Sequence, residues 1–207
     1  TSVINRSRTV ADGMSKGVQF LFKKNKIDVI SGTGRLVSMG KVEVAGNNGD
    51  KTILEADHII LATGARSKEL PDLKLDGRKI IGYREALALP EVPKSMIVVG
   101  SGAIGSEFAG FYNSMGTKVM LVEFLPNIVP LEDEEVSKQL ERSFKKAGIN
   151  VLTGSSVESA EISGNLCKAK IITPGGTEEH EAQIILSAVG ITPNIENIGL
   201  EELGIEI

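Results

Sequence analysis

Residues 95–123 alternate between apolar runs and one amphipathic segment, an order that few folds accommodate. SMIVVG (95–100) is predicted to be a strand, AIGSEFAGFYNSMG (103–116) a helix ended by Gly116, and KVMLVE (118–123) a second strand. Two strands that are joined through a helix run parallel in one sheet, because the helix carries the chain back to the starting edge. We therefore predict an α/β fold built on a parallel sheet.

The turn between the first strand and the helix, GSGAIG at residues 100–105, has the GxGxxG spacing of a dinucleotide-binding site. Gly100 permits a tight turn, Gly102 lets a pyrophosphate approach the backbone, and Gly105 lets the helix pack closely on the strand. The helix N-terminus offers free N–H groups and a partial positive charge to the phosphates. The motif alone is a weak signal, and the alternative is a turn that binds nothing. The flanking strand and helix favour a Rossmann-like nucleotide site.

Two acidic residues accompany this turn. Glu123 ends the second strand, where a carboxylate accepts hydrogen bonds from the adenosine ribose and repels the 2′-phosphate of NADP. Residues 124–130 contain no arginine that would bind such a phosphate, so NAD is the expected cofactor. Glu107 lies in the second turn of the helix. It either complements the helix dipole or lies beside the cofactor, and the residues alone leave both readings open.

The alternation continues to residue 190. The pattern predicts a helix over 133–147 ended by Gly148, a third strand over 149–157, an antiparallel meander over 158–163, 166–173 and 177–182, and a buried strand over 184–190. Before this unit, it predicts a helix over 6–24, an extended run over 27–36, a hairpin of 41–44 and 51–56, a buried parallel strand over 58–64, and a proline-rich linker over 67–93.

One phrase occurs twice. EADHIILATGA (55–65) closely resembles EAQIILSAVGI (181–191), and a meander pattern precedes each. One explanation is that the chain holds two copies of a nucleotide-binding design, of which the first lacks its beginning. The other is that buried strands share common residues. The matching meanders favour duplication.

Composition removes several classes of protein. The 207 residues carry a net charge of −4, which argues against a nucleic-acid partner. No stretch approaches the ~20 apolar residues of a membrane helix, and no signal-peptide pattern is present, so a cytoplasmic location is expected. One cysteine, Cys167, and two histidines predict neither a disulfide, a CxxxxC redox pair nor a metal cluster. The chain begins at Thr1 rather than Met, and we expect it to be a piece of a longer protein.

Several phrases together resemble one family. VVGSGAIGSEFA, VEFLPNIVPLEDEEV and SAVGITPNIENIGLEELGI resemble the NAD domain of the pyridine nucleotide–disulfide oxidoreductases, and within that family chiefly the members that act on dihydrolipoamide. GVQFLFKKNKIDVISGTGRL and ADHIILATGARSKELP resemble its FAD domain. The resemblance implies a fold of the FAD/NAD(P)-binding type. It also implies a partial FAD domain at 1–71, an NAD domain at 72–190 and the start of a return segment at 191–207.

The resemblance also implies site residues. Glu107 would orient the nicotinamide carboxamide and pair with a lysine on the flavin side. Those that would contact NAD are Gly100, Ser101, Gly102, Ala103, Ile104, Gly105, Ser106, Glu107, Glu123, Val157 on the adenine side, and Gly190 on the nicotinamide side. Those that would contact FAD are Gly34, Thr63, Gly64 and Ala65.

Two positions depart from the family. Many members have a larger side chain where Ala103 stands, which implies a more open nicotinamide pocket. Many also have arginine where Ile191 stands, which leaves the local charge near the cofactor unsettled. The family's redox disulfide, first GxGxxG, second FAD-binding segment and His–Glu dimer domain have no counterpart here, and neither His58 nor His180 lies in a phrase that resembles the catalytic loop. No catalytic residue is therefore expected in this chain.

The implied function is the NAD-binding portion of an enzyme that transfers electrons between dihydrolipoamide and NAD through a flavin. The whole protein would be a homodimer in a 2-oxo acid dehydrogenase complex with lipoamide as its substrate, whereas these 207 residues alone would be inactive. One alternative is a related flavoprotein NADH-dependent reductase or oxidase. Another is a free-standing NAD-binding module without catalysis.

Overall fold

The computed structural model describes residues 2–207, and their contacts divide the chain into two units. The first, here called the sheet unit, comprises residues 67–192 together with residues 2–4. The second, here called the hairpin unit, comprises residues 5–66 and 193–207. The chain passes from one to the other within a helix, α1 (Ser2–Lys24), and again within two short strands, β4 (Ala65–Ser67) and β13 (Ile191–Pro193), which pair with each other.

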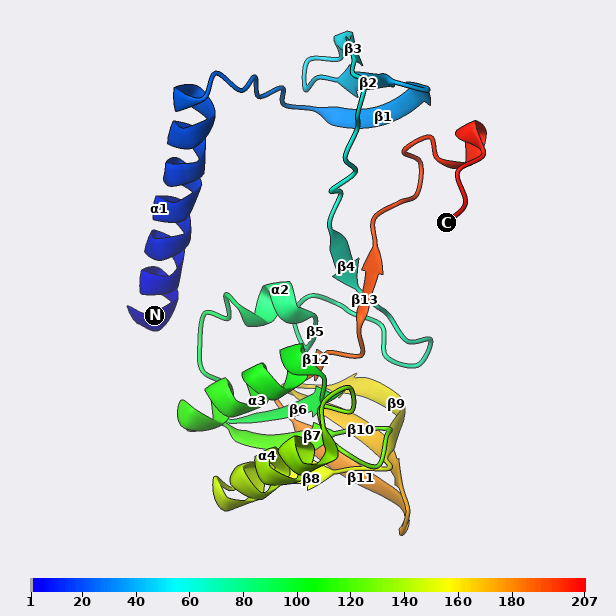
Figure 1. Ribbon diagram of the computed structural model, residues 1–207. Helices are drawn as coiled ribbons and strands as arrows, with labels where there is room; N and C mark the ends of the chain where they lie inside the picture. The colour runs from blue at the N-terminus through cyan, green and yellow to red at the C-terminus, as the bar shows by residue number, and fades with distance from the viewer. Residues whose placement is uncertain (1) are drawn as a thin grey trace. The chain divides into compact units, whose positions relative to one another are not determined.

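A five-stranded parallel sheet forms the centre of the sheet unit (Figure 1). Its order is β5-β12-β6-β7-β8, and each neighbouring pair is parallel. The strands are β5 (Ile80–Ile81), β6 (Ser95–Val99), β7 (Lys118–Val122), β8 (Asn150–Leu152) and β12 (Ile184–Ser187). The α/β fold and the three longer strands predicted from the sequence are therefore confirmed.

Helices cover one face of this sheet (Figure 1). α3 (Ala103–Ser114) and α4 (Glu134–Lys146) pack against alternate strand residues such as Val98 and Leu121, which are fully buried. Asp133 caps α4 by accepting a hydrogen bond from the Glu135 N–H at 2.8 Å. A short helix, α2 (Tyr83–Ala86), follows β5.

Tyr112 ties α3 to α2. Its ring is 2% exposed, and its hydroxyl donates a hydrogen bond to the Ala86 carbonyl. Burial raises the pKa of Tyr112 to about 12, because the charged phenolate would lose its hydration.

This shift makes stability depend on pH. The folded pKa lies above the unfolded value of about 10, so the contribution of Tyr112 is complete below pH 10 and is lost between about pH 10 and 12. We expect Tyr112→Phe to cost about 1 kcal/mol at pH 8 through the lost hydrogen bond, and to show a smaller further loss at pH 11 than the unchanged chain. Urea unfolding at both pH values is the measurement. An equal pH-dependent loss in the two proteins would contradict the assignment.

An antiparallel meander covers the other face of the sheet (Figure 1). Its strands are β9 (Ser156–Ser163), β10 (Leu166–Thr173) and β11 (Gly176–Ala182), and β10 lies in the middle. Cys167, Ala169 and Ile171 point from β10 into the core beneath the sheet. The Cys167 thiol is fully buried, and desolvation raises its pKa, so it is a structural strand thiol as expected.

The hairpin unit contains α1 from Asn5 onward, a second meander and a 3-10 helix. The meander order is β1-β2-β3, antiparallel throughout, as in the sheet unit. The elements are α1 (Ser2–Lys24), β1 (Thr33–Ser38), β2 (Lys41–Ala45), β3 (Lys51–Glu55) and the 3-10 helix Glu201–Leu203. The Leu36 N–H donates to the Ile198 carbonyl at 2.8 Å, which attaches the 193–207 segment to β1.

Three sequence predictions are wrong. Residues 58–64 form no strand and are largely exposed, with Ile60 90% exposed, because no strand among the described residues pairs with them. The region 67–93 is not simply a linker, since it contains α2 and the buried edge strand β5. The predicted strand 149–157 is two elements: β8 ends at Leu152, and β9 begins at Ser156.

Candidate dinucleotide site

The glycine turn lies at the carboxyl edge of the central strand β6. Gly100 has a φ of +95°, and a Cβ built on it would lie 2.5 Å from the Ala188 carbonyl oxygen at the end of β12. A Cβ on Gly105 would lie 1.9 Å from the Gly100 carbonyl oxygen. A Cβ on Gly102 would meet nothing within 4 Å. The three glycines therefore have the separate roles that the spacing predicts: a tight turn, close packing of helix on strand, and an open approach.

Gly102 is the N-cap of α3, so the open side of the turn faces the start of a 12-residue helix. The first-turn N–H groups of a helix lack intrahelical partners and carry partial positive charge. No acidic side chain in the first turn of α3 neutralises that charge. Ala103 is exposed there, and Ser106 is buried with its hydroxyl donating to the Ser101 carbonyl at 2.8 Å. This geometry suits a phosphate anion.

Glu123 follows β7 at the same edge and is only 7% exposed. Its Oε2 accepts hydrogen bonds from the N–H and the hydroxyl of Ser101, both at 2.7 Å. Its Oε1 accepts one from the Leu125 N–H at 2.8 Å. All three donors are neutral, so the carboxylate is held in place without a cation.

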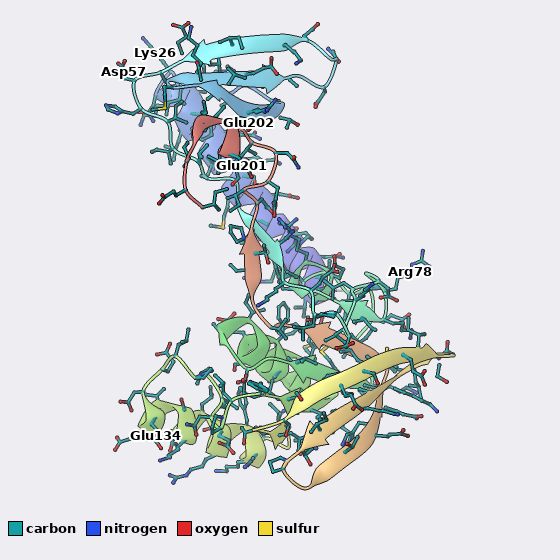
Figure 2. All side chains as sticks on the ribbon, turned by 90° about the vertical axis from the view of Figure 1, so that its right-hand side faces the viewer. Lys26, Asp57, Arg78, Glu134, Glu201 and Glu202 are labelled. Carbon is teal, nitrogen blue, oxygen red and sulfur yellow. The ribbon has the colours of Figure 1, made fainter. Side chains whose placement is uncertain are left out.

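The surface beyond Glu123 is acidic. A hollow of about 300 Å³ is lined by Leu125, Pro126, Asn127, Pro130, Glu132, Glu134 and Ser137. Figure 2 shows Glu134 at the outer start of α4. Two carboxylates and no cationic side chain line this hollow, which disfavours an additional phosphate there.

Of the remaining NAD candidates, Gly190 and Glu107 are exposed, whereas Val157 lies on a different strand from the one predicted. Gly190 lies beyond the end of β12, exposed, with a φ of +119°. Glu107 is exposed on α3, where it can reach a ligand. Val157 does not end the third parallel strand, contrary to the prediction. It is the second residue of β9, pairs with Ile171 and packs into the core under the meander, because the turn after β8 redirects the chain.

The FAD candidates lie in the hairpin unit. Gly34 is exposed on β1, and Thr63 and Gly64 are exposed in the segment that precedes β4, with Ala65 half-buried. The Thr63 carbonyl accepts a hydrogen bond from the Asn194 side chain at 3.2 Å, and the Gly64 carbonyl accepts one from the Asn194 N–H at 3.0 Å. These carbonyls are therefore occupied within the hairpin unit, although Gly34, Thr63 and Gly64 remain exposed.

Arg66 strengthens this attachment, and sequence reasoning missed it. Its guanidinium contacts both carboxylate oxygens of Glu196, at 2.6 and 3.0 Å, and the Asn194 side chain at 3.0 Å. The hydrogen bond from Arg66 lowers the pKa of Glu196 to about 2. The sequence shows only a positive charge, Arg66 in ATGARS, and a negative charge, Glu196 in TPNIE, and these phrases lie far apart.

The histidines and Cys167 do not form a redox or metal centre. His58 is exposed in the irregular segment after β3. His180 lies on β11 with its Nε2 2.8 Å from Glu178 Oε2. Within residues 2–207, no cluster of His, Cys, Asp or Glu could hold a metal ion, and no helix is long and apolar enough to cross a membrane.

Comparisons with known proteins agree with this geometry. Residues 2–207 match the family described as pyridine nucleotide-disulphide oxidoreductase. The chain belongs to this family. The family identification stated from the motifs is therefore confirmed, and NAD and FAD are the family's cofactors.

Individual relatives share the whole length of the chain. A dihydrolipoyl dehydrogenase of Zymomonas mobilis is 44% identical over 207 residues, which are 99% of this chain and 44% of that protein. A dihydrolipoyl dehydrogenase of Mycobacterium tuberculosis is 38% identical over 203 residues, 98% of this chain and 44% of that protein. The chain thus spans less than half the length of these relatives.

Solved structures share the fold. The crystal structure of LpdA from Mycobacterium tuberculosis has a TM-score of 0.89 and 28% identity, covering 99% of this chain and 45% of that one. The HOCl-induced flavoprotein disulfide reductase RclA from Escherichia coli has a TM-score of 0.83 at 22% identity, covering 99% of this chain and 46% of that one, which supports the fold alone.

Proposed function

We propose that this member of the pyridine nucleotide-disulphide oxidoreductase family binds NAD(H) between the start of α3 and Glu123. The observation that carries the proposal is the open Gly102 N-cap beside a buried carboxylate at the same edge of the sheet. In open α/β sheets, ligands bind at the carboxyl ends of the strands, at the point where the strand order reverses. The order β12-β6-β7 places the turn at such a point.

Different groups of the chain bind different parts of the cofactor. The first-turn N–H groups of α3, from Ala103 on, receive the pyrophosphate, and Glu123 receives the adenosine ribose hydroxyls. Glu107, one turn further along α3, and Gly190, beyond β12, lie on the nicotinamide side. Val157 would contact the adenine side with only part of its side chain, because it is half-buried and packs against the core under the meander.

The whole protein would be a flavoprotein in which nicotinamide and flavin exchange a hydride, with dihydrolipoamide as the dithiol substrate. Relatives named dihydrolipoyl dehydrogenase support this proposal. In it, residues 72–190 are the NAD domain, 1–71 part of the FAD domain through Gly34 and Thr63–Ala65, and 191–207 the start of the return segment. The 207 residues alone would lack lipoamide activity. A homodimer, a 2-oxo acid dehydrogenase complex and a cytoplasmic location complete the proposal.

Calorimetric titration of the 207-residue chain with NADH and with NADPH tests the binding site. We expect NADH to bind more tightly, because the 2′-phosphate would meet Glu123 and the acidic hollow beyond it. Glu123→Ala should weaken NADH binding about tenfold and reduce the preference, since it removes a charge-assisted hydrogen-bond acceptor.

Glu161→Ala is the matched control, because it removes an equal charge from the exposed far end of β9, away from Glu123. It should change neither affinity by more than about twofold, as expected for a distant surface charge. Equal affinities of the unchanged chain for NADH and NADPH would show that the assignment of Glu123 is wrong.

A further inference from the structure

We propose that Ser101 is a positioning residue that orients the Glu123 carboxylate and so sets the preference for NAD(H) over NADP(H). This inference rests on the proposed function, because it concerns the same site. Ser101 is the variable second residue of the GxGxxG turn. We infer that it acts on the cofactor through Glu123, which lies 22 positions further along the chain.

The contact is unusually complete. Ser101 is fully buried, and both its N–H and its hydroxyl donate to the same oxygen, Glu123 Oε2, at 2.7 Å. The other oxygen, Oε1, accepts only the Leu125 N–H, at 2.8 Å. A carboxylate offers about four acceptor positions, so this arrangement saturates Oε2 and leaves a free position on Oε1. The ribose hydroxyls would therefore be received by Oε1.

Of the three hydrogen bonds to the Glu123 carboxylate, only the one from the Ser101 hydroxyl depends on a side chain. The Ser101 N–H and the Leu125 N–H are backbone groups that any residue would supply. Without the hydroxyl, Oε2 keeps one donor, and a buried carboxylate with an unfilled acceptor position turns toward any other donor or toward water. Rotation of Glu123 would take Oε1 away from the ribose and its charge away from the position of a 2′-phosphate.

A double-mutant cycle separates this role from a merely structural one. NADH and NADPH dissociation constants are measured by calorimetry on the 207-residue chain, on Ser101→Ala, on Glu123→Ala and on the double variant. Ser101→Ala should weaken NADH binding about fivefold while NADPH binding changes less than twofold. In the Glu123→Ala background, Ser101→Ala should have no further effect on NADH, because the group through which it acts is gone.

Thr117→Val is the control for loss of a buried hydroxyl. Thr117 is 2% exposed and donates to the Pro93 carbonyl at 2.8 Å, just before β7 at the amino edge of the sheet. It should lower stability without changing the ratio of the two affinities. If Ser101→Ala does not fold, as judged by circular dichroism, Ser101→Cys replaces it and should weaken NADH binding to an intermediate extent, since a thiol is a weak donor.

Three results would overturn the inference. Additive losses in the cycle would show that Ser101 does not act through Glu123. Equal weakening of NADH and NADPH would show a general effect on the turn. In both cases the unchanged chain still binds NADH, and the proposed function stands. If the unchanged chain binds neither cofactor, the proposed function fails and this inference fails with it.

Discussion

Gly105→Ala is expected to lower the free energy of unfolding of the sheet unit by about 3 kcal/mol or more, which exceeds most single substitutions. The added Cβ would lie 1.9 Å from the Gly100 carbonyl oxygen and 3.0 Å from its carbonyl carbon. Both are backbone atoms of the turn, and Gly100 itself abuts Ala188 at the end of β12. Since no flexible side chain can yield, α3 must move away from β6, and the packing between them is lost.

Gly110→Ala is the matched control, because it makes the same substitution in the same helix. Its Cβ would lie 3.9 Å from Phe144 Cε1, an ordinary contact, and alanine is a better helix former than glycine by about 1 kcal/mol. We expect this variant to be as stable as the unchanged chain or slightly more stable. Urea unfolding followed by circular dichroism measures both. A Gly105→Ala protein as stable as Gly110→Ala would contradict the described packing of α3 on β6.

Gly102→Ala should do the opposite, leaving the fold nearly intact while abolishing most cofactor binding. Its φ of −61° and ψ of −175° suit alanine, and the added Cβ would meet nothing within 4 Å. The loss of stability should stay below about 1 kcal/mol, the scale of an N-cap substitution. The same open space is where the pyrophosphate approaches the backbone, so affinity for NADH should fall on the order of 100-fold.

NADH and NADPH share the pyrophosphate, so Gly102→Ala should weaken both equally. This distinguishes it from changes at Glu123 and Ser101, which alter the ratio of the two affinities. Calorimetric titration with each cofactor is the measurement. Unchanged affinity for NADH would mean that the pyrophosphate does not lie over this turn.

Much of the sheet unit follows from local sequence signals. Gly116 and Gly148, with φ of +94° and +89°, lie just beyond the helices whose ends they were predicted to mark. The short strand β5 was missed, because two isoleucines in a proline-rich stretch carry no periodicity. The strand over 58–64 was predicted from its apolar run, but a buried parallel strand also needs a neighbouring strand, and no strand among the described residues pairs with this segment.

In the candidate site, too, features set by neighbouring residues were predicted, whereas contacts between distant residues were not. The motif spacing predicted the roles of Gly100, Gly102 and Gly105, since each depends on backbone geometry within one turn. The bond from Ser101 to Glu123 joins residues on different elements, and no pattern in the sequence predicts it. Val157 was misplaced because the prediction joined the segments on either side of Thr153–Ser155 into one strand, although Gly154, with a φ of +59°, breaks the chain direction there.

The central claim is that the start of α3 and Glu123 bind NAD(H). The most direct test is to titrate the isotopically labelled 207-residue chain with NADH and to follow its backbone amide resonances. We expect the largest changes at Ser101–Ser106 and at Glu123–Leu125, smaller ones at Gly190, and none at the far end of β9, residues 161–163. Saturable changes that are confined to other segments, or no changes at these amides at millimolar NADH, would contradict it.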